Sequence, residues 1–139
     1  MSNEERVAIQ KPYALAMVIC DHVWRDGATG KCTLLGSFSY IAAASFPATH
    51  QSMGIYAAIT DGRGKVPIAL TIVDADQEEA LFRADAELDC NDPRAVNELI
   101  LNLQNMTFPR PGEYRVQLFA GDEFLLERRL IVQQLEDKP

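Results

Sequence analysis

The sequence lacks any apolar run that approaches the roughly 18 residues of a membrane-spanning helix. It also lacks an apolar stretch near its start, because Met1 to Gln10 reads MSNEERVAIQ and is polar. A secretory signal peptide needs such a stretch. We therefore expect a cytoplasmic protein with no membrane association.

Basic residues are scarce. Lysine and arginine number 13 against 20 acidic residues, which gives a formal net charge of −7. The few arginines that lie close together, Arg110 and the pair Arg128 and Arg129, stand among acids. A protein that neutralises phosphates needs a basic face. The composition therefore disfavours nucleic acid and anionic membranes as partners.

Soft metal ligands are few as well, since the chain holds two histidines and three cysteines. The cysteines, Cys20, Cys32 and Cys90, are odd in number and form no CxxC pair, so we expect unbridged thiols. Cys20 and His22 share one side of a predicted strand, but a structural zinc site needs four converging ligands. We predict no bound metal and no cofactor.

Nucleophilic catalysis has equally little support. Cys20 with His50, or a serine with His22, could supply a nucleophile and a base. No Gly-x-Ser-x-Gly segment is present, and no cysteine stands at a helix start. The segment from Gly27 to Cys32 resembles part of a phosphate-binding loop, but it lacks the first glycine and a hydroxyl residue after the lysine. We expect a protein that is not an enzyme.

The chain is rich in runs that alternate with a period of two, which is the pattern of β-strands. With 139 residues and 47% hydrophobic composition, it suits one domain. We predict a polar segment over 1–12, a single domain over 13–133 and a polar tail over 134–139. The predicted strands are Tyr13–Trp24, Lys31–Ala42, Met53–Thr60, Val66–Asp74, Leu81–Cys90 and two within Tyr114–Val132.

Turn chemistry separates these runs. Asp61 to Gly64 is the clearest hairpin signal, and Gly121 with Asp122 turns the final hairpin. The stretch from Ser45 to Ser52 reads as a loop. Asn91 to Gln104 fits a helix or a strand, and we predict one helical turn from Pro93 and then a strand to Leu103. The fold expected is an all-β, antiparallel, immunoglobulin-like β-sandwich of about eight strands with at most one short helical turn.

Several segments, taken in order, carry a resemblance. They are ALAMVICDHV from Ala14, GATGKCTLLGSF from Gly27, SFPATH from Ser45 and FPRPGEYRVQLFAGDEFLLERRLIV from Phe108. Together they resemble a family of small uncharacterised bacterial proteins, a domain of unknown function with a β-sandwich fold. The resemblance runs from about Tyr13 to Val132. It implies the fold and a bacterial, cytosolic setting, and it supplies no activity.

An acidic turn offers one binding site. Asp74 to Glu79 is rich in carboxylates, and β-sandwich loops can bind calcium through such oxygens. The alternative reading is a solvated turn. A sandwich that binds calcium or a small ligand is therefore our second functional hypothesis.

Apolar residues on the second faces of the strands point to an interface. Val18 and Leu125 lie opposite the stronger apolar face of their strands, where a wetted sheet should be polar. We expect a protein-interaction or structural module that self-associates, with a symmetric homodimer as the default and an unidentified protein partner besides. The alternative is that the segment from Asn91 to Gln104, or the long loop, covers these side chains. The predicted interface residues are Trp24, Tyr56, Phe119 and Ile131.

Overall fold

The computed structural model describes residues 11–136, which form nine β-strands and no helix. Most of the predicted polar N-terminal segment and the last three residues of the predicted tail lie outside the described residues. Among residues 11–136, therefore, no helix is long and apolar enough to cross a membrane. The strands are β1 Tyr13–Arg25, β2 Cys32–Ser37, β3 Tyr40–Ala43, β4 Ala48–Thr60, β5 Gly64–Asp74, β6 Glu79–Cys90, β7 Asn97–Phe108, β8 Gly112–Ala120 and β9 Glu123–Gln134.

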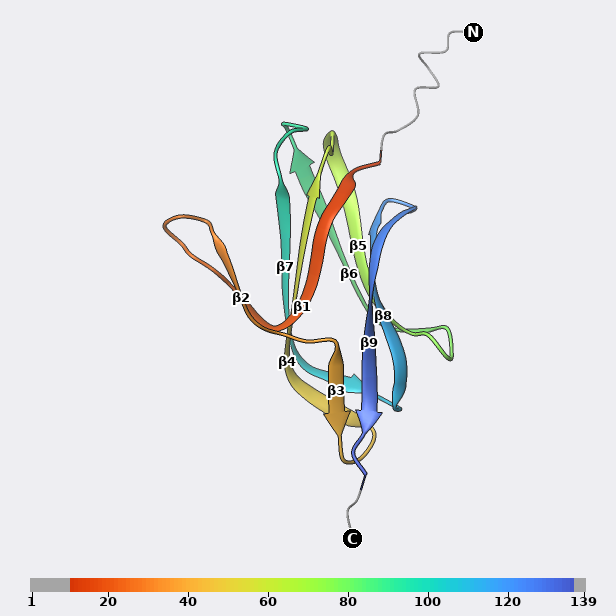
Figure 1. The fold of residues 1–139 in the computed structure, drawn as a ribbon. Helices are drawn as coiled ribbons and strands as arrows, with labels where there is room; N and C mark the ends of the chain where they lie inside the picture. Colours follow the sequence, from red (N-terminus) through yellow and green to blue (C-terminus); the bar gives the residue numbers. More distant parts are fainter. Residues whose placement is uncertain (1–10, 137–139) are drawn as a thin grey trace, which may run out of the picture.

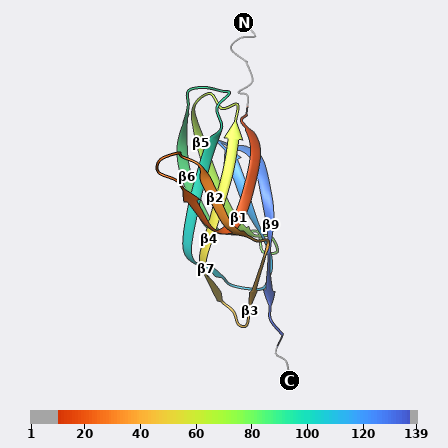
Figure 2. The same ribbon diagram turned by 60° about the vertical axis from the view of Figure 1, so that its left-hand side comes forward.

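The strands form two sheets that pack face to face (Figures 1 and 2). Sheet A has four strands in the order β2-β1-β4-β7, and sheet B has five in the order β3-β9-β8-β5-β6. All neighbours are antiparallel except β3 and β9, which run parallel. The predicted antiparallel sandwich is confirmed, with nine strands instead of about eight.

The core follows from the alternation of β4 and β5. On β4 the inward side chains run from Met53 to Ile59, and on β5 they run from Val66 to Ile72. These side chains are almost fully buried, because successive residues of a strand point to opposite faces and the apolar set meets the other sheet. Fully burying one such aliphatic side chain stabilises the fold by about 1.5–3 kcal/mol.

A tyrosine fixes the crossing from sheet A to sheet B. The connection from β7 to β8 passes Arg110, and the Oη of buried Tyr114 donates a hydrogen bond of 2.6 Å to the Arg110 carbonyl. The Tyr114 ring packs edge-on against Phe108, with centroids 5.0 Å apart. A tyrosine that bonds back to the backbone a few residues upstream at such a corner is a hallmark of immunoglobulin-like sandwiches. The immunoglobulin-like part of the prediction is therefore confirmed as well.

The predicted hairpin at Asp61 to Gly64 is wrong. The turn does reverse the chain, with positive φ at Asp61 and Gly64, but β4 belongs to sheet A and β5 to sheet B. The turn therefore carries the chain across the core. Gly62 lies against Cys90, whose Sγ would be 2.6 Å from a Cβ at that position, so the crossing needs a glycine there. Turn chemistry shows where a chain reverses but not whether the flanking strands pair.

Three further boundaries differ from the prediction. The helical turn expected at Pro93 is a β-turn, closed by a bond of 3.0 Å from the Ala95 amide to the Asp92 carbonyl, and no helix follows. The run from Lys31 to Ala42 divides into β2 and β3, which lie in different sheets. The predicted loop after Phe46 extends β4 back to Ala48, because its polar residues pair with the end of β7.

Candidate functional site

The thiols and histidines do not converge on a single site. Cys20 and Cys90 are both buried, and burial raises the pKa of each thiol. His50 lies four residues along β4 from Gly54, the residue that pairs with Cys20, which is about 13 Å of extended strand. The His50 ring packs against Phe38, with centroids 5.3 Å apart. Within residues 11–136, no three His, Cys, Asp or Glu side chains cluster as metal ligands would.

The acidic turn is built around Asp74, whose side chain is only 3% exposed. One carboxylate oxygen accepts the amides of Asp76 and Gln77, at 3.0 and 3.2 Å, and the other accepts Arg110 Nη2 at 2.5 Å. Burial by itself would raise the pKa of Asp74, but the hydrogen bonds from Arg110, Gln77 and Asp76 outweigh it and hold the pKa below its ordinary value. Both oxygens are therefore committed to closing the turn against the β7–β8 connection.

The β1–β2 hairpin projects from the outer face of sheet A (Figure 1). Its turn is closed by Asp26, which accepts hydrogen bonds from the Thr29 amide and hydroxyl at 2.8 and 2.6 Å. The segment that resembled a phosphate-binding loop is this turn. Farther along the hairpin, Trp24 and Leu35 are 51% and 53% exposed. The hairpin therefore presents two large apolar side chains to solvent.

The base of the hairpin is tied to the outer face of β7. The Asn102 side chain brackets Val23, accepting its amide at 2.9 Å and donating to its carbonyl at 3.0 Å. Arg25 forms an ion pair of 3.5 Å with Glu98, which also accepts a short hydrogen bond from Tyr56. Burial, together with this bond to Glu98, raises the pKa of Tyr56 to about 12. Polar bonds to the hairpin therefore occupy much of the outer face of β7.

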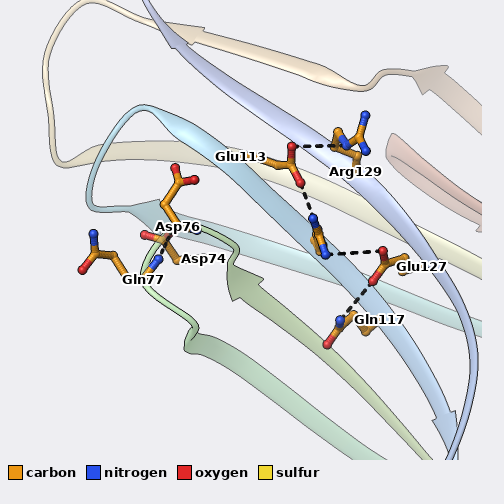
Figure 3. Close-up of polar contacts among 8 residues, drawn as sticks. Asp74, Asp76, Gln77, Glu113, Gln117, Glu127 and Arg129 are labelled. Atoms are coloured by element: carbon orange, nitrogen blue, oxygen red, sulfur yellow. Dashed lines mark hydrogen bonds and ion pairs between the residues drawn. The ribbon is translucent and has the colours of Figure 1, made fainter.

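The outer face of sheet B carries a ladder of charges across β8 and β9 (Figure 3). Arg115 pairs with Glu113 at 2.9 Å and with Glu127 at 3.7 Å. Arg129 joins the ladder through Glu113 at 3.3 Å, and Gln117 joins it through Glu127 at 3.0 Å. Each charged group of this ladder is therefore paired with a group of opposite charge in the ladder.

The four predicted interface residues divide between the two outer faces. Trp24 and Tyr56 belong to sheet A, whereas Phe119 and Ile131 belong to sheet B. On sheet B the ladder separates the two, because Phe119 packs against Phe124 at one end of the β8–β9 pair and Ile131 pairs with Glu113 at the other. One contact surface cannot contain all four residues.

An apolar cleft opens where the two sheets part, between the edge strands β6 and β7. Its volume is about 90 Å³, and Asp85 is the one charged residue in its lining. The leucines of β7 that border the cleft remain half-buried instead of fully buried. The apolar residues of its lining are Ile55, Ala57, Ile68, Leu70, Ala84, Ala86, Leu99, Ile100 and Leu101.

The four sheet edges differ in how they are protected from pairing with another chain. β2 and β3 are short, with six and four residues, whereas β6 and β7 have twelve each. β6 carries four acidic residues and one basic residue, and its pairing with β5 is bulged near Ile72. β7 has one charged residue, Glu98, and its pairing with β4 has no register shift. Short length, charge and bulges are the usual protection of an edge, so β7 is the least protected of the four.

The chain matches a family of unknown function, DUF6941, over residues 15–133. The chain belongs to this family. The resemblance expected from the sequence is thereby confirmed, and the DUF6941 family brings no activity with it. No curated protein matches the chain.

Solved structures similar to this DUF6941 domain include an immunoglobulin-like protein from Pseudomonas aeruginosa. The two chains share 15% identity with a TM-score of 0.47, over 90% of this chain and 98% of that one. A β-glucosidase from Listeria innocua in complex with isofagomine is 13% identical with a TM-score of 0.47, over 69% of this chain and 15% of the enzyme.

Sequence reasoning missed β7 as the exposed edge. The signal was present, because twelve residues from Asn97 to Phe108 contain a single charge and alternate through Leu99, Leu101 and Leu103. The proline and the possible N-cap before this segment favoured a helical turn and hid the length of the strand. Which strand lies at an edge depends on pairing across the sheet, which periodicity does not report.

Proposed function

We propose that this domain is a non-enzymatic protein-interaction module that self-associates as a homodimer in the cytoplasm. The observation that carries the proposal is the open side of the sandwich, where the long, nearly uncharged strand β7 borders an apolar cleft. Exposed apolar surface beside unpaired strand backbone favours association with another polypeptide.

The polar groups of the domain support a role in binding more than one in catalysis. Asp74 is engaged by Arg110 and two backbone amides, and the ladder around Arg115 is internally paired. A catalytic acid, base or nucleophile must instead present a free atom to a substrate. The unpaired thiols Cys20, Cys32 and Cys90 suit a reducing compartment such as the cytoplasm.

The β1–β2 hairpin supplies a second surface for an unidentified protein partner. Trp24 and Leu35 lie exposed on it, and neither lines the cleft. Tryptophan is among the side chains most enriched where binding energy concentrates in interfaces. We assign this hairpin to the partner and the open side to self-association.

Light scattering coupled to size exclusion tests the proposal. We expect a mass that rises from monomer to dimer as the protein concentration approaches about 100 µM, since micromolar affinity is the scale of a modest interface. A strict monomer throughout that range would contradict self-association. Circular dichroism of the same samples establishes that the β fold is intact.

A further inference from the structure

We propose that the second copy binds through β7 itself, antiparallel to the β7 of the first copy, so that the two four-stranded sheets A join edge to edge. This inference rests on the self-association proposed above and names the contact. A two-fold axis through the middle of the paired strands relates the copies, which is the symmetry of an isologous dimer. Antiparallel pairing of one strand with itself satisfies that symmetry directly.

Charge selects β7 among the four edges. Each copy carries a net charge of −7, so two copies repel at long range, and the added repulsion at the contact is smallest where the paired surfaces are close to neutral. Pairing β6 with itself would bring together two strands that each hold four acidic residues and one basic residue. β7 holds only Glu98, which already pairs with Arg25 at 3.5 Å. Like charges opposite each other destabilise paired strands, and β7 avoids them.

The direction of approach follows from the two faces of β7. Its outer face is held by the hairpin through Asn102 and Glu98, so the partner cannot bind there without breaking those bonds. The hairpin projects outward from sheet A (Figure 1), and the strand edge lies beside it. The partner therefore arrives in the plane of sheet A and pairs with the free backbone groups of β7.

The inward side chains of the partner strand would complete the apolar cleft. Leu99, Leu101 and Leu103 point from β7 toward sheet B and remain half-buried. Paired strands place side chains of the same face next to one another, so the partner's leucines would lie over the same opening. A cavity of about 150 Å³ accepts benzene, so the 90 Å³ of this cleft suits one aliphatic side chain better than a cofactor.

Cysteine crosslinking tests the contact. Ile100 pairs with Tyr56 in the regular part of β7, and its side chain faces outward from sheet A. In the proposed dimer it would lie next to the partner's β7. In a Cys32→Ser background, which removes the most accessible thiol, we expect Ile100→Cys to give a crosslinked dimer with a short bismaleimide. Tyr40→Cys is the matched control, because Tyr40 is 61% exposed on β3, an edge strand of the other sheet, and it should stay monomeric on a denaturing gel.

A charge substitution gives an independent readout. Lysine on an exposed edge is a natural block to strand pairing. We expect Ile100→Lys to reduce dimer formation at least tenfold in light scattering, whereas Tyr40→Lys leaves it unchanged. If circular dichroism shows that Ile100→Lys does not fold, the crosslink decides alone.

The outcomes separate this inference from the proposed function. If the wild-type chain stays monomeric, both the proposed function and this contact are contradicted. A dimer that survives Ile100→Lys and yields no crosslink through Ile100→Cys keeps the function and overturns the contact. A dimer lost in Trp24→Asp but kept in Ile100→Lys would move the interface to the β1–β2 hairpin and overturn it as well.

Discussion

Tyr114 and Asp74 are buried polar side chains that fasten loops at the same end of the sandwich. Tyr114 bonds to the Arg110 carbonyl, and Asp74 pairs with the Arg110 guanidinium. Arg110 thus connects the β5–β6 turn to the connection between β7 and β8. Removing a buried partner leaves the other group unsatisfied, which costs more than the net value of the bond.

Replacing Tyr114 with phenylalanine removes the hydroxyl and keeps the ring against Phe108. We expect the free energy of unfolding to fall by about 1–3 kcal/mol, because the Arg110 carbonyl loses its donor. Urea titration followed by circular dichroism measures the change. Tyr40→Phe is the control, since Tyr40 is exposed on β3, and it should change stability by no more than about 0.5 kcal/mol. Equal effects in the two variants would argue against the corner bond.

Asp74 makes stability depend on pH in the acid range. Its pKa in the folded chain lies below the value of about 3.9 for an unfolded aspartate. Its contribution is therefore present at pH values above about 3.9 and is lost as pH falls through the lower folded pKa.

We expect Asp74→Asn to lower the free energy of unfolding near neutral pH by about 1.5–3 kcal/mol, the range for hydrogen bonds to charged groups. The variant should also lose less stability than the wild type between about pH 5 and pH 2. Urea titrations across that range test both statements. Asp122→Asn, at the exposed turn between β8 and β9, is the control. Parallel pH curves for the wild type and Asp74→Asn would contradict the assignment.

The three thiols should react at different rates. Cys20 and Cys90 are buried and their pKa values are raised by burial, whereas Cys32 is only partly buried. Because the thiolate is the reactive form, we expect native iodoacetamide labelling to modify Cys32 first. In denaturant all three should react, with or without reductant, as intact mass will show. A disulfide in freshly purified protein would refute the cytoplasmic assignment.

At the scale of elements, the hairpin base and β7 hold each other in place. Asn102→Ala removes both hydrogen bonds to the Val23 backbone, so we expect faster amide hydrogen exchange in the β1–β2 hairpin. Stability should fall by about 1–3 kcal/mol as buried backbone groups lose their partner. Gln104→Ala, two residues along the same face of β7, is the matched control and should leave hairpin exchange unchanged. Uniformly faster exchange across the domain would indicate global destabilisation instead.

Strand existence was predictable from alternation, but sheet membership was not. Gly121 and Asp122 join two strands that do pair, whereas Asp61 and Gly64 join two that lie in different sheets. Both turns contain glycine and aspartate. Whether the flanking strands pair depends on which apolar faces pack together in the core. Sandwich connections often cross between sheets, so a turn signal alone cannot choose.

The four predicted interface residues also show what the alternation predicts, which is the face of a strand, and what it does not predict, which is the sheet. Their period-two position correctly placed Tyr56 and Phe119 on the faces opposite the core. It could not assign the two faces to opposite sheets, nor reveal that Tyr56 would bond to Glu98 from β7. Pairing of β4 with β7, which are far apart in sequence, created that contact.

The whole molecule carries its net charge of −7 into any dimer. If β7 forms the contact, the interface itself is nearly neutral and the long-range term between copies is repulsive. Salt shortens the Debye length from about 10 Å at 0.1 M to about 3 Å at 1 M. We therefore expect added sodium chloride to strengthen dimerisation, measured by sedimentation equilibrium. Weakening by salt would indicate an interface held by ion pairs and would point away from β7.

The inequality of the sheet edges also limits how large an assembly can grow. Among the described strands, a pair of β7 strands uses the one long edge with a single charge, and the remaining edges are short or acidic. A third copy would find no backbone that accepts it, so growth terminates at two and fibrils have no template. The acidic residues of β6 therefore oppose further pairing, and neutral side chains in place of Asp85 and Glu87 would weaken that protection.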